Sequence, residues 1–511
     1  MVQIISTLQE FISGDAQTVY SFTGLVKQIY RTEQGLNIFT VSDGDTSLKL
    51  VAFTRSGVAY GEIQEGSVAT FHIKQKPYDG EMQGTIVDAT SAVSGVDALA
   101  LRRQLLLKEY TSFRPSSDEL KIQTYDFEHL QPSLLTAATL IKGAVASKRP
   151  ILITHHNDTD GYSAGILLER AIKKLLEESH GDIRYLQNYL QRNPSRTPYY
   201  DLTDVTRDIA FFQLNQQRAG TASPLILIVD NGSTDQDLLA IQKASIFGAD
   251  VIVIDHHDPG VKDDQGKTPI CHHTLAHVNP HLQGITKDIS ASMLCYQLAD
   301  FLGDEPSALL GALGGVADRC EGSSIDQLIK LSGKTRERLQ VVGRCIDYEI
   351  YQTKFNHSTG ALYELFDGEQ QDALVDLYVP LLEAEKKKIA ASLQHYVVEE
   401  TIGDFTVHFL DGEGLSLWGD YFSIGKLAGL FHDTVEKENH ITVVHSNSII
   451  VFRCAQKNHS FDVNVLLKEL QETHPHIRVD GGGHAVAGSL RFISIAKDEV
   501  LDFIKTFIKK Q

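Results

Sequence analysis

The sequence predicts an α/β protein in three parts: an N-terminal OB-like β-barrel, a central domain on a parallel sheet, and a smaller C-terminal α/β domain. Two patterns support this fold class. Short strands separated by turn residues occupy the first 95 residues, and two later segments alternate apolar strands with helices. With 511 residues the chain also exceeds the size of one hydrophobic core, so several domains are expected.

The barrel is expected over residues 1–95. About five short strands lie between residues 18 and 93, with turn signals such as Asp43-Gly44 and Asp79-Gly80 between them. This spacing is typical of a small barrel, and the number of strands favours an OB-type barrel over an SH3-like one.

Aromatic side chains alternate with basic ones along this segment. In an OB-type barrel the mixture would offer stacking surfaces beside cations for a single nucleic-acid strand. A small domain nevertheless needs most of its large apolar groups in the core, so we interpret each aromatic residue as core, with Tyr78 in the turn KPYDGE as the exception. The set comprises Tyr20, Phe22, Tyr30, Phe39, Phe53 and Tyr78, with Lys27, Lys49, Arg55, Lys74 and Lys76.

The central domain is expected at residues 131–335, after a helical connector at 96–130. Its segments PILITHH, PLILIVDNGST and DVIVIDHHDP are continuous apolar runs, and the first two lead into helix-like stretches. Such strands belong to parallel sheets with helices on both faces.

A helical linker is expected at 336–400. There Lys386, Lys387 and Lys388 are interpreted as a solvated helix face rather than a nucleic-acid patch. From 401 to 511, strands such as DFTVHFLDG again alternate with helices such as DVNVLLKELQET, which predicts the second α/β domain.

Composition narrows the class of protein. A hydrophobic share of 42% is ordinary for a globular chain, and the net charge of -19 disfavours general adhesion to nucleic acid or an anionic membrane. A polyanion would therefore need local basic patches or bound metal ions. Five scattered cysteines without a C-x-x-C pair argue against a disulfide framework and a thiolate zinc site. Without a leader pattern or a long apolar stretch, we expect a cytoplasmic protein with no membrane partner.

Acidic and imidazole side chains gather where the predicted central strands end. Functional groups of open parallel sheets collect at these carboxyl ends, and crowded carboxylates need cations to offset their repulsion. Ligands of this kind without thiolates favour Mn²⁺ over Mg²⁺ or Zn²⁺. Taken singly, Asp158 or Asp230 could be a helix N-cap, and paired histidines could be surface residues. The residues are His155, His156, Asp158, Asp160, Asp230, Asp255, His256, His257, Asp258 and Asp318.

This arrangement resembles the DHH phosphoesterase superfamily, which includes RecJ-type exonucleases, oligoribonucleases, cyclic-dinucleotide phosphodiesterases and family II pyrophosphatases. The stretches HNDTDG, VDNG and DHH and the late Asp318 match its four motifs in order. Farther on, DGGGHAVAGS at 480–489 is similar to the GGGH motif of the DHH-associated domain. The Asn-Gly pair after Asp230 is like that of RecJ proteins, while Thr159 replaces an Ala common in related first motifs.

The resemblance implies roles for individual residues. Asp230 would bridge two metal ions, His257 would contact phosphate or assist the leaving group, and Asp255 would orient His257. His155 has no clear counterpart in the family. The implied metal ligands are His156, Asp158, Asp160, Asp230, His256 and Asp318.

The C-terminal motif offers a second group of anion-binding residues. Three consecutive glycines allow backbone N–H groups to converge on an anion, and neighbouring basic side chains add a donor and a fixed charge. We expect this group to hold a phosphate or sugar next to the scissile bond; the alternative is a glycine-rich tight turn without a ligand. Its members are Arg453, Gly481, Gly482, Gly483 and His484.

The segment CHHTLAHVNPH contains five potential zinc ligands, but their spacing fits no standard zinc site, so structural or supporting roles are expected. Its members are Cys271, His272, His273, His277 and His281, with His277 and Asn279 the residues of most interest, because similar proteins also carry VNP after DHH.

These features predict a metal-dependent phosphodiesterase, a RecJ-like exonuclease that hydrolyses single-stranded DNA or RNA. Two divalent ions, Mn²⁺ in preference to Mg²⁺, would lie about 4 Å apart and activate a shared water. The alternatives are an oligoribonuclease or cyclic-dinucleotide phosphodiesterase, and a nucleic-acid-binding scaffold of a replication complex. The complete ligand set disfavours the scaffold, although replication or repair proteins are expected as further partners.

Overall fold

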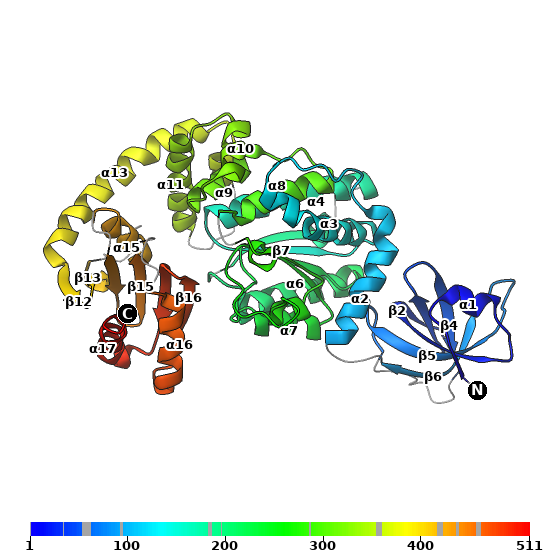
Figure 1. Ribbon diagram of the computed structural model, residues 1–511. Coiled ribbons are helices and arrows are strands. Elements are labelled where there is room, and N and C mark those ends of the chain that lie inside the picture. Colours follow the sequence, from blue (N-terminus) through cyan, green and yellow to red (C-terminus); the bar gives the residue numbers. More distant parts are fainter. Residues whose placement is uncertain are drawn as a thin grey trace. The chain divides into compact units, whose positions relative to one another are not determined.

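The computed structural model describes residues 2–33, 35–53, 63–91, 96–181, 186–195, 197–285, 288–353, 360–415, 423–435, 439–455 and 461–511. The chain divides into two compact units, Met1–Gly343 and Arg344–Gln511. The predicted fold class is confirmed: an N-terminal barrel, a parallel sheet and a C-terminal α/β region follow one another (Figure 1).

The N-terminal barrel closes because one long strand, β2, pairs with β3 along its second half and with β5 along its first half. The ring runs β2-β3-β4-β6-β5 and returns to β2, which is consistent with the predicted OB-like domain. A short β1 (Val2–Ile4) pairs parallel with β2 and leads into α1 (Leu8–Ser13). The ring strands are β2 (Val19–Arg31), β3 (Asn37–Ser42), β4 (Ser47–Ala52), β5 (Val68–Gln75) and β6 (Gly84–Ser91).

The barrel core takes only part of the aromatic set. Tyr20, Phe22 and Phe39 are buried, as predicted. Tyr78 is exposed, also as predicted, because it lies in the turn between β5 and β6. The core interpretation is wrong for Tyr30 and Phe53, which are 57% and 50% exposed. Arg55 lies outside the described residues.

The central sheet has five strands, all parallel, in the order β11-β10-β9-β7-β8. Every residue of β7, β9 and β10 is buried, which explains why these strands are apolar throughout instead of alternating. The strands are β7 (Ile151–His155), β8 (Leu190–Pro194), β9 (Leu225–Val229), β10 (Asp250–Ile254) and β11 (Ala276–Val278).

Helices cover both faces of this sheet (Figure 1). On one face, α6 (Leu202–Ala219) and α7 (Leu238–Ile246) pack on side chains of β7, β9 and β10 to form a hydrophobic core. The other face is covered by α3 (Tyr125–Ala146), α4 (Thr159–His180) and α8 (Ala291–Leu302). Helix α3 was not predicted as a separate element, and it begins inside the expected connector, after α2 (Val96–Glu109). The unit continues through α9 (Ala308–Ala317), α10 (Ser323–Ser332) and the start of α11 (Arg336–Thr353).

The second unit holds a six-stranded mixed sheet in the order β12-β13-β14-β15-β17-β16. One face packs on α16 (Val463–Thr473) and α17 (Lys497–Ile508), and the other on α15 (Ile424–His432) and α13 (Gln371–Tyr396). The strands are β12 (Val398–Ile402), β13 (Phe405–Asp411), β14 (His440–His445), β15 (Ile449–Cys454), β16 (Asp480–His484) and β17 (Ala487–Arg491), and the remaining helices are α12 (Gly360–Asp367) and α14 (Gly412–Leu415).

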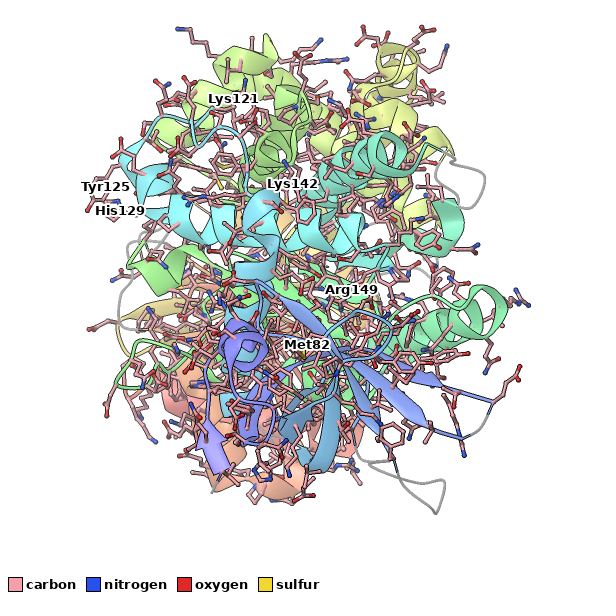
Figure 2. The ribbon with its side chains drawn as sticks, turned by 90° about the vertical axis from the view of Figure 1, so that its right-hand side faces the viewer. Met82, Lys121, Tyr125, His129, Lys142 and Arg149 are labelled. Carbon is pink, nitrogen blue, oxygen red and sulfur yellow. The ribbon has the colours of Figure 1, made fainter. Side chains whose placement is uncertain are left out.

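A buried carboxylate joins the connector helix to the central sheet. Asp250, the first residue of β10, accepts hydrogen bonds at 2.7 Å from Arg102 of α2 and from Arg149, which Figure 2 labels. Arg102 also donates to the backbone oxygen of Gly66 in the barrel. Burial alone would raise the pKa of Asp250, but the two guanidinium groups hold it below its usual value. The barrel, α2 and the sheet therefore meet at one charged group.

We expect Asp250→Ala to lower the free energy of unfolding by about 3 to 5 kcal/mol, because it leaves two buried guanidinium groups without their counter-charge. Asp264→Ala, in an exposed turn, is the matched control. Urea unfolding followed by circular dichroism measures both variants. A midpoint for Asp250→Ala equal to that of Asp264→Ala would contradict the interpretation.

Candidate metal centre

Strand register brings three motifs to the same edge of the central sheet. His155 at the end of β7 pairs with Val229 at the end of β9, which is level with Ile254 at the end of β10. The residues that follow these strands therefore emerge side by side. They begin the stretches HNDTDG, DNG and DHH.

All six predicted metal ligands lie in three overlapping groups, in each of which the potential ligand atoms are within 4.8 Å of one another. Asp230 belongs to two of these groups, a position that suits the bridging role expected of it. His256 also belongs to two. The groups are Asp230, Asp255, His256 and His257; His156, Asp158 and Asp230; and Asp160, His256 and Asp318.

The first motif supplies one group through the start of α4. His156 Nδ1 lies 2.8 Å from Asp158 Oδ2 and 3.5 Å from Asp230 Oδ2. The other oxygen of Asp158 accepts a hydrogen bond from the backbone N–H of Gly161, so this residue is indeed the N-cap of α4. The cap and the metal-ligand interpretations are therefore compatible, because each uses a different carboxylate oxygen.

His256 links the late aspartate to the other motifs. His256 Nε2 is 3.1 Å from Asp318 Oδ2, at the end of α9, and 3.1 Å from Asp230 Oδ1. Asp160 faces the same group, and its oxygens accept the backbone N–H groups of Ala291 and Ser292 at the start of α8. A Cβ atom on Gly314 of α9 would lie 2.2 Å from Asp160 Oδ1, which explains why small residues precede Asp318.

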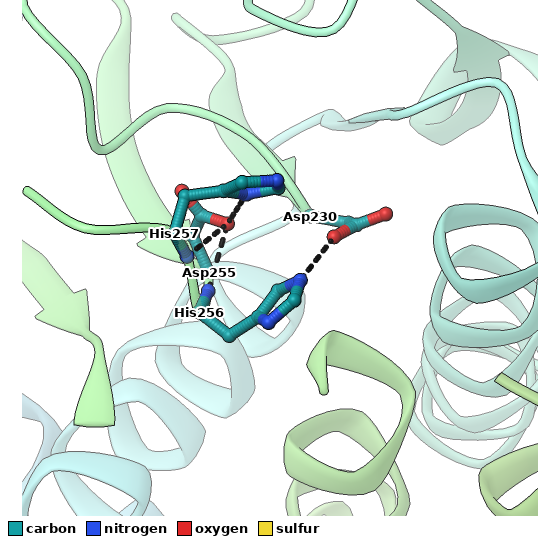
Figure 3. A group of neighbouring side chains, drawn as sticks. All are labelled: Asp230, Asp255, His256 and His257. Atoms are coloured by element: carbon teal, nitrogen blue, oxygen red, sulfur yellow. Dashed lines mark hydrogen bonds and ion pairs between the residues drawn. The ribbon is translucent and has the colours of Figure 1, made fainter. Parts of the chain in front are cut away.

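Asp255 organises the DHH turn (Figure 3). Its Oδ1 accepts the backbone N–H of His256 at 2.7 Å and His257 Nδ1–H at 2.7 Å, while its Oδ2 accepts the N–H of Ser233. Burial would raise the pKa of Asp255, but His257 and the other donors hold it far below the usual value. For the imidazole of His257, burial has the opposite effect and lowers the pKa. The negative charge of Asp255 outweighs burial, so the pKa of His257 is raised.

The electrostatics of the cluster call for cations. Asp230 is 1% exposed, and neither of its oxygens has a well-formed hydrogen bond, although His256 approaches one of them. Burial raises the pKa of both Asp230 and Asp160, and neighbouring carboxylates raise it further. Burial lowers the pKa of the two neighbouring imidazoles, but the carboxylates more than reverse this effect. Asp158 raises the pKa of His156 well above normal, and Asp230 and Asp318 do the same for His256. Divalent ions would replace these protons, so the residues present fit a metal site.

His155 takes no part in the cluster. Its Nδ1–H donates to the backbone oxygen of His156, and its Nε2 accepts from Arg192 Nη1 at 2.7 Å, which together require a neutral ring. Burial and the charge of Arg192 lower its pKa well below normal, in agreement with that state. Arg192 Nε in turn donates to Glu169 Oε2 at 2.9 Å. This chain of contacts fixes the backbone of His156, and no pattern around Arg192 in the sequence pointed to it.

The CHHTLAHVNPH segment supports the DHH turn instead of forming its own group of ligands in the described part of the chain. Asn279 Nδ2 donates to the backbone oxygen of His257 and to Ser233 Oγ. His277 lies between Ser233 Oγ, at 2.9 Å, and Cys271 Sγ, at 3.4 Å. Burial lowers the pKa of His277 to about 4, so it is neutral near pH 7.

In the second unit the glycine motif forms an edge strand, not a turn. Gly481, Gly482 and Gly483 have φ values of 159°, 151° and 138°, which only glycine adopts readily. The register of β16, β17 and β15 places His484, Ala487 and Arg453 in one row across the sheet. The side chain of His484 is outside the described part of the structure.

Comparisons with known proteins agree with this geometry. Residues 150–313 match the model of the DHH family, N-terminal domain. The uncharacterized protein MJ1198 of Methanocaldococcus jannaschii is 29% identical over 99% of this chain and 71% of its own length. A solved DHH domain, described as a member of the S1p family of ribosomal proteins, is 30% identical, with a TM-score of 0.73 over 80% of this chain and 98% of that one. The chain belongs to the DHH family.

As a DHH protein the chain is a phosphoesterase, a hydrolase of phosphodiester or phosphoanhydride bonds. RecJ from Thermus thermophilus, solved in complex with Mn²⁺, has a TM-score of 0.51 at 16% identity, over 80% of this chain and 59% of that one. This likeness shows a shared fold. Among the described residues, no helix is both long and apolar enough to cross a membrane.

The contact between Arg192 and His155 predicts an effect on metal affinity. Arg192→Met should weaken Mn²⁺ binding by about tenfold or more, because His155 then loses the partner that holds its ring against the His156 backbone. Isothermal titration calorimetry measures the affinity, and Lys173→Met on the exposed side of α4 is the control. Unchanged affinity in Arg192→Met would show that His155 does not position His156.

Proposed function

We propose that this protein is a metal-dependent phosphodiesterase of the RecJ-like kind, which hydrolyses single-stranded DNA or RNA from an end. The observation that carries the proposal is the cluster of carboxylates and imidazoles at the carboxyl edge of the central sheet. Parallel α/β sheets bind ligands at this edge. The cluster also offers Asp230 as a buried carboxylate shared by two ligand groups.

The metal ions would be held by the six carboxylates and imidazoles that come together there. Their oxygen and nitrogen ligands favour Mn²⁺ and allow Mg²⁺. When bound, a pair of divalent ions supplies an activated water and offsets charge on the phosphate oxygens. The ligands are His156, Asp158, Asp160, Asp230, His256 and Asp318.

His257, oriented by Asp255, would donate a proton to the leaving group. The bond from His257 Nδ1 to Asp255 fixes the ring orientation, so Nε2 is the nitrogen that can donate to the leaving oxygen. Asn279 and Ser233 hold the same turn through the His257 backbone and Asp255. These contacts would keep the acid in place while the substrate phosphate enters.

The second unit would bind the nucleotide next to the scissile bond. The motif of Gly481, Gly482 and Gly483 leaves backbone groups uncovered by side chains, and the row that contains Arg453 and His484 adds basic residues. A site rich in carboxylates cannot supply this anion contact. We therefore assign substrate binding to these residues and bond cleavage to the metal cluster.

A polymer is the favoured substrate because the barrel adds a domain that a dinucleotide would not need. We expect faster Mn²⁺-dependent cleavage of a labelled single strand of about 30 nucleotides than of a dinucleotide. Release of mononucleotides, resolved by gel and chromatography, measures both rates. A strong preference for the dinucleotide would instead favour an oligoribonuclease or a cyclic-dinucleotide phosphodiesterase.

Asp230→Ala should reduce hydrolysis by more than about 100-fold, because it removes the carboxylate shared by two ligand groups. Strand binding should be retained. Mn²⁺ should raise the unfolding temperature of the EDTA-treated wild type but not that of the variant, since ions stabilise only a protein that binds them. Asp258→Ala is the matched control, because Asp258 is exposed and outside the three groups. Full hydrolytic activity in Asp230→Ala would show that Asp230 is not a ligand of the metal centre.

A further inference from the structure

One outward row of side chains crosses all five strands of the barrel ring. Strand register places Tyr30 of β2 opposite Ile38 of β3, Ile38 opposite Val51 of β4, Val51 opposite Thr85 of β6, and Thr85 opposite Lys74 of β5. Residues directly opposite one another share a face of the sheet. The adjacent row contains the buried Phe39 and Leu50, so this row faces outward.

A small pocket lies where this row crosses β4 and β6. It has a volume of about 170 Å³ and is smaller than the pockets that enclose whole drug-sized ligands, so it suits one flat ring with the rest of the molecule outside. Two aromatic rings at the pocket, Phe53 and Tyr78, are 50% and 67% exposed. The lining residues are Val51, Phe53, Lys76, Tyr78, Gln83, Gly84 and Thr85.

Positive charge accompanies the rings although the chain as a whole is acidic. Lys76 Nζ lies 4.1 Å from the centroid of the Phe53 ring, which holds the ammonium at the pocket. Within the described residues neither Lys74 nor Lys76 has an acidic partner, whereas Lys49 is 3.7 Å from Glu81. Exposed rings beside uncompensated cations are the combination that binds bases and phosphates of single strands.

We propose that this face of the barrel binds a single strand of nucleic acid, with one base in the pocket against Tyr78 and Phe53 and with Lys74 and Lys76 facing the phosphates. Gln83 and Thr85 supply polar atoms to the edge of that base. The inference deepens the proposed function, on which it rests for the identity of the strand as substrate. It assigns binding of the strand to the barrel and cleavage to the metal-ligand cluster.

Fluorescence anisotropy with labelled DNA and RNA strands of about 20 nucleotides, in EDTA so that no cleavage occurs, tests the full-length chain. Tyr78→Ala and Phe53→Ala should each weaken binding by about 5- to 100-fold, the usual effect of removing one stacking ring. Tyr78→Phe keeps the ring and should bind like the wild type. Lys76→Gln should reduce the slope of log affinity against log salt by about 0.7, as expected for one phosphate contact with a single strand.

The matched control is Tyr125→Ala. Tyr125 is an aromatic residue of α3, 70% exposed and labelled in Figure 2. Its ring centroid lies 4.0 Å from that of His129, with the rings tilted by 42°, and its loss should leave binding unchanged. Circular dichroism verifies that each variant folds, which is expected because both pocket rings lie outside the barrel core. Affinity of the Phe53→Ala/Tyr78→Ala double variant equal to that of the wild type overturns the inference. So does a wild type that binds no single strand.

The two proposals fail separately because binding is measured without metal. A chain that grips the strand through Tyr78 and Phe53 but hydrolyses nothing in Mn²⁺ retains this inference and loses the proposed function. If the chain hydrolyses strands but its barrel variants bind like the wild type, the proposed function is retained and this inference is lost.

Discussion

The first unit is organised around the cost of placing several carboxylates together in a buried place. Asp230, Asp160 and Asp255 are each exposed by 1% or less, and Asp158 lies beside them. Like charges at this distance raise one another's pKa and destabilise the folded chain unless opposite charge is supplied. Backbone N–H groups of the surrounding structure provide part of that opposite charge. Divalent ions would provide the rest, and their binding would be favoured for that reason.

Backbone N–H groups provide the fixed part. Asp160 receives them at the start of α8, Asp158 receives one at the start of α4, and Asp255 receives them from the DHH turn and from Ser233. Helix starts carry partial positive charge, so Asp158 and Asp160 are held where the burial of their charge costs least. Asp230 is the exception: it has a φ of 56° and no well-formed hydrogen bond to either oxygen, and the imidazoles of His156 and His256 approach those oxygens.

Recognition of a polyanion by a chain of net charge -19 requires that attraction be local. The described structure offers three candidate places: the metal-ligand cluster, the row containing Arg453 in the second unit, and the lysine-flanked aromatic face of the barrel. In the proposed function the first would activate the bond, the second would contact an anion beside glycine backbone, and the third would stack on a base. None of these roles requires a strongly basic surface over the whole chain.

The sequence by itself determined the fold class and the group of acidic and imidazole residues that meet at the sheet edge, because both leave local patterns. Fully apolar strands can only be buried on both faces, and the ends of adjacent parallel strands must meet, so HNDTDG, DNG and DHH were bound to converge. Only the tertiary structure decided which polar residues support them. The chain of contacts from Glu169 through Arg192 to His155 had no signal in the sequence. Asn279 belongs to the VNP stretch, but only the structure shows that it donates to the His257 backbone. The tertiary structure also decided that Tyr30 faces outward, because the face of a strand residue on a closed barrel depends on register, which aromatic composition does not specify. Phe53 is exposed because it follows the last residue of β4.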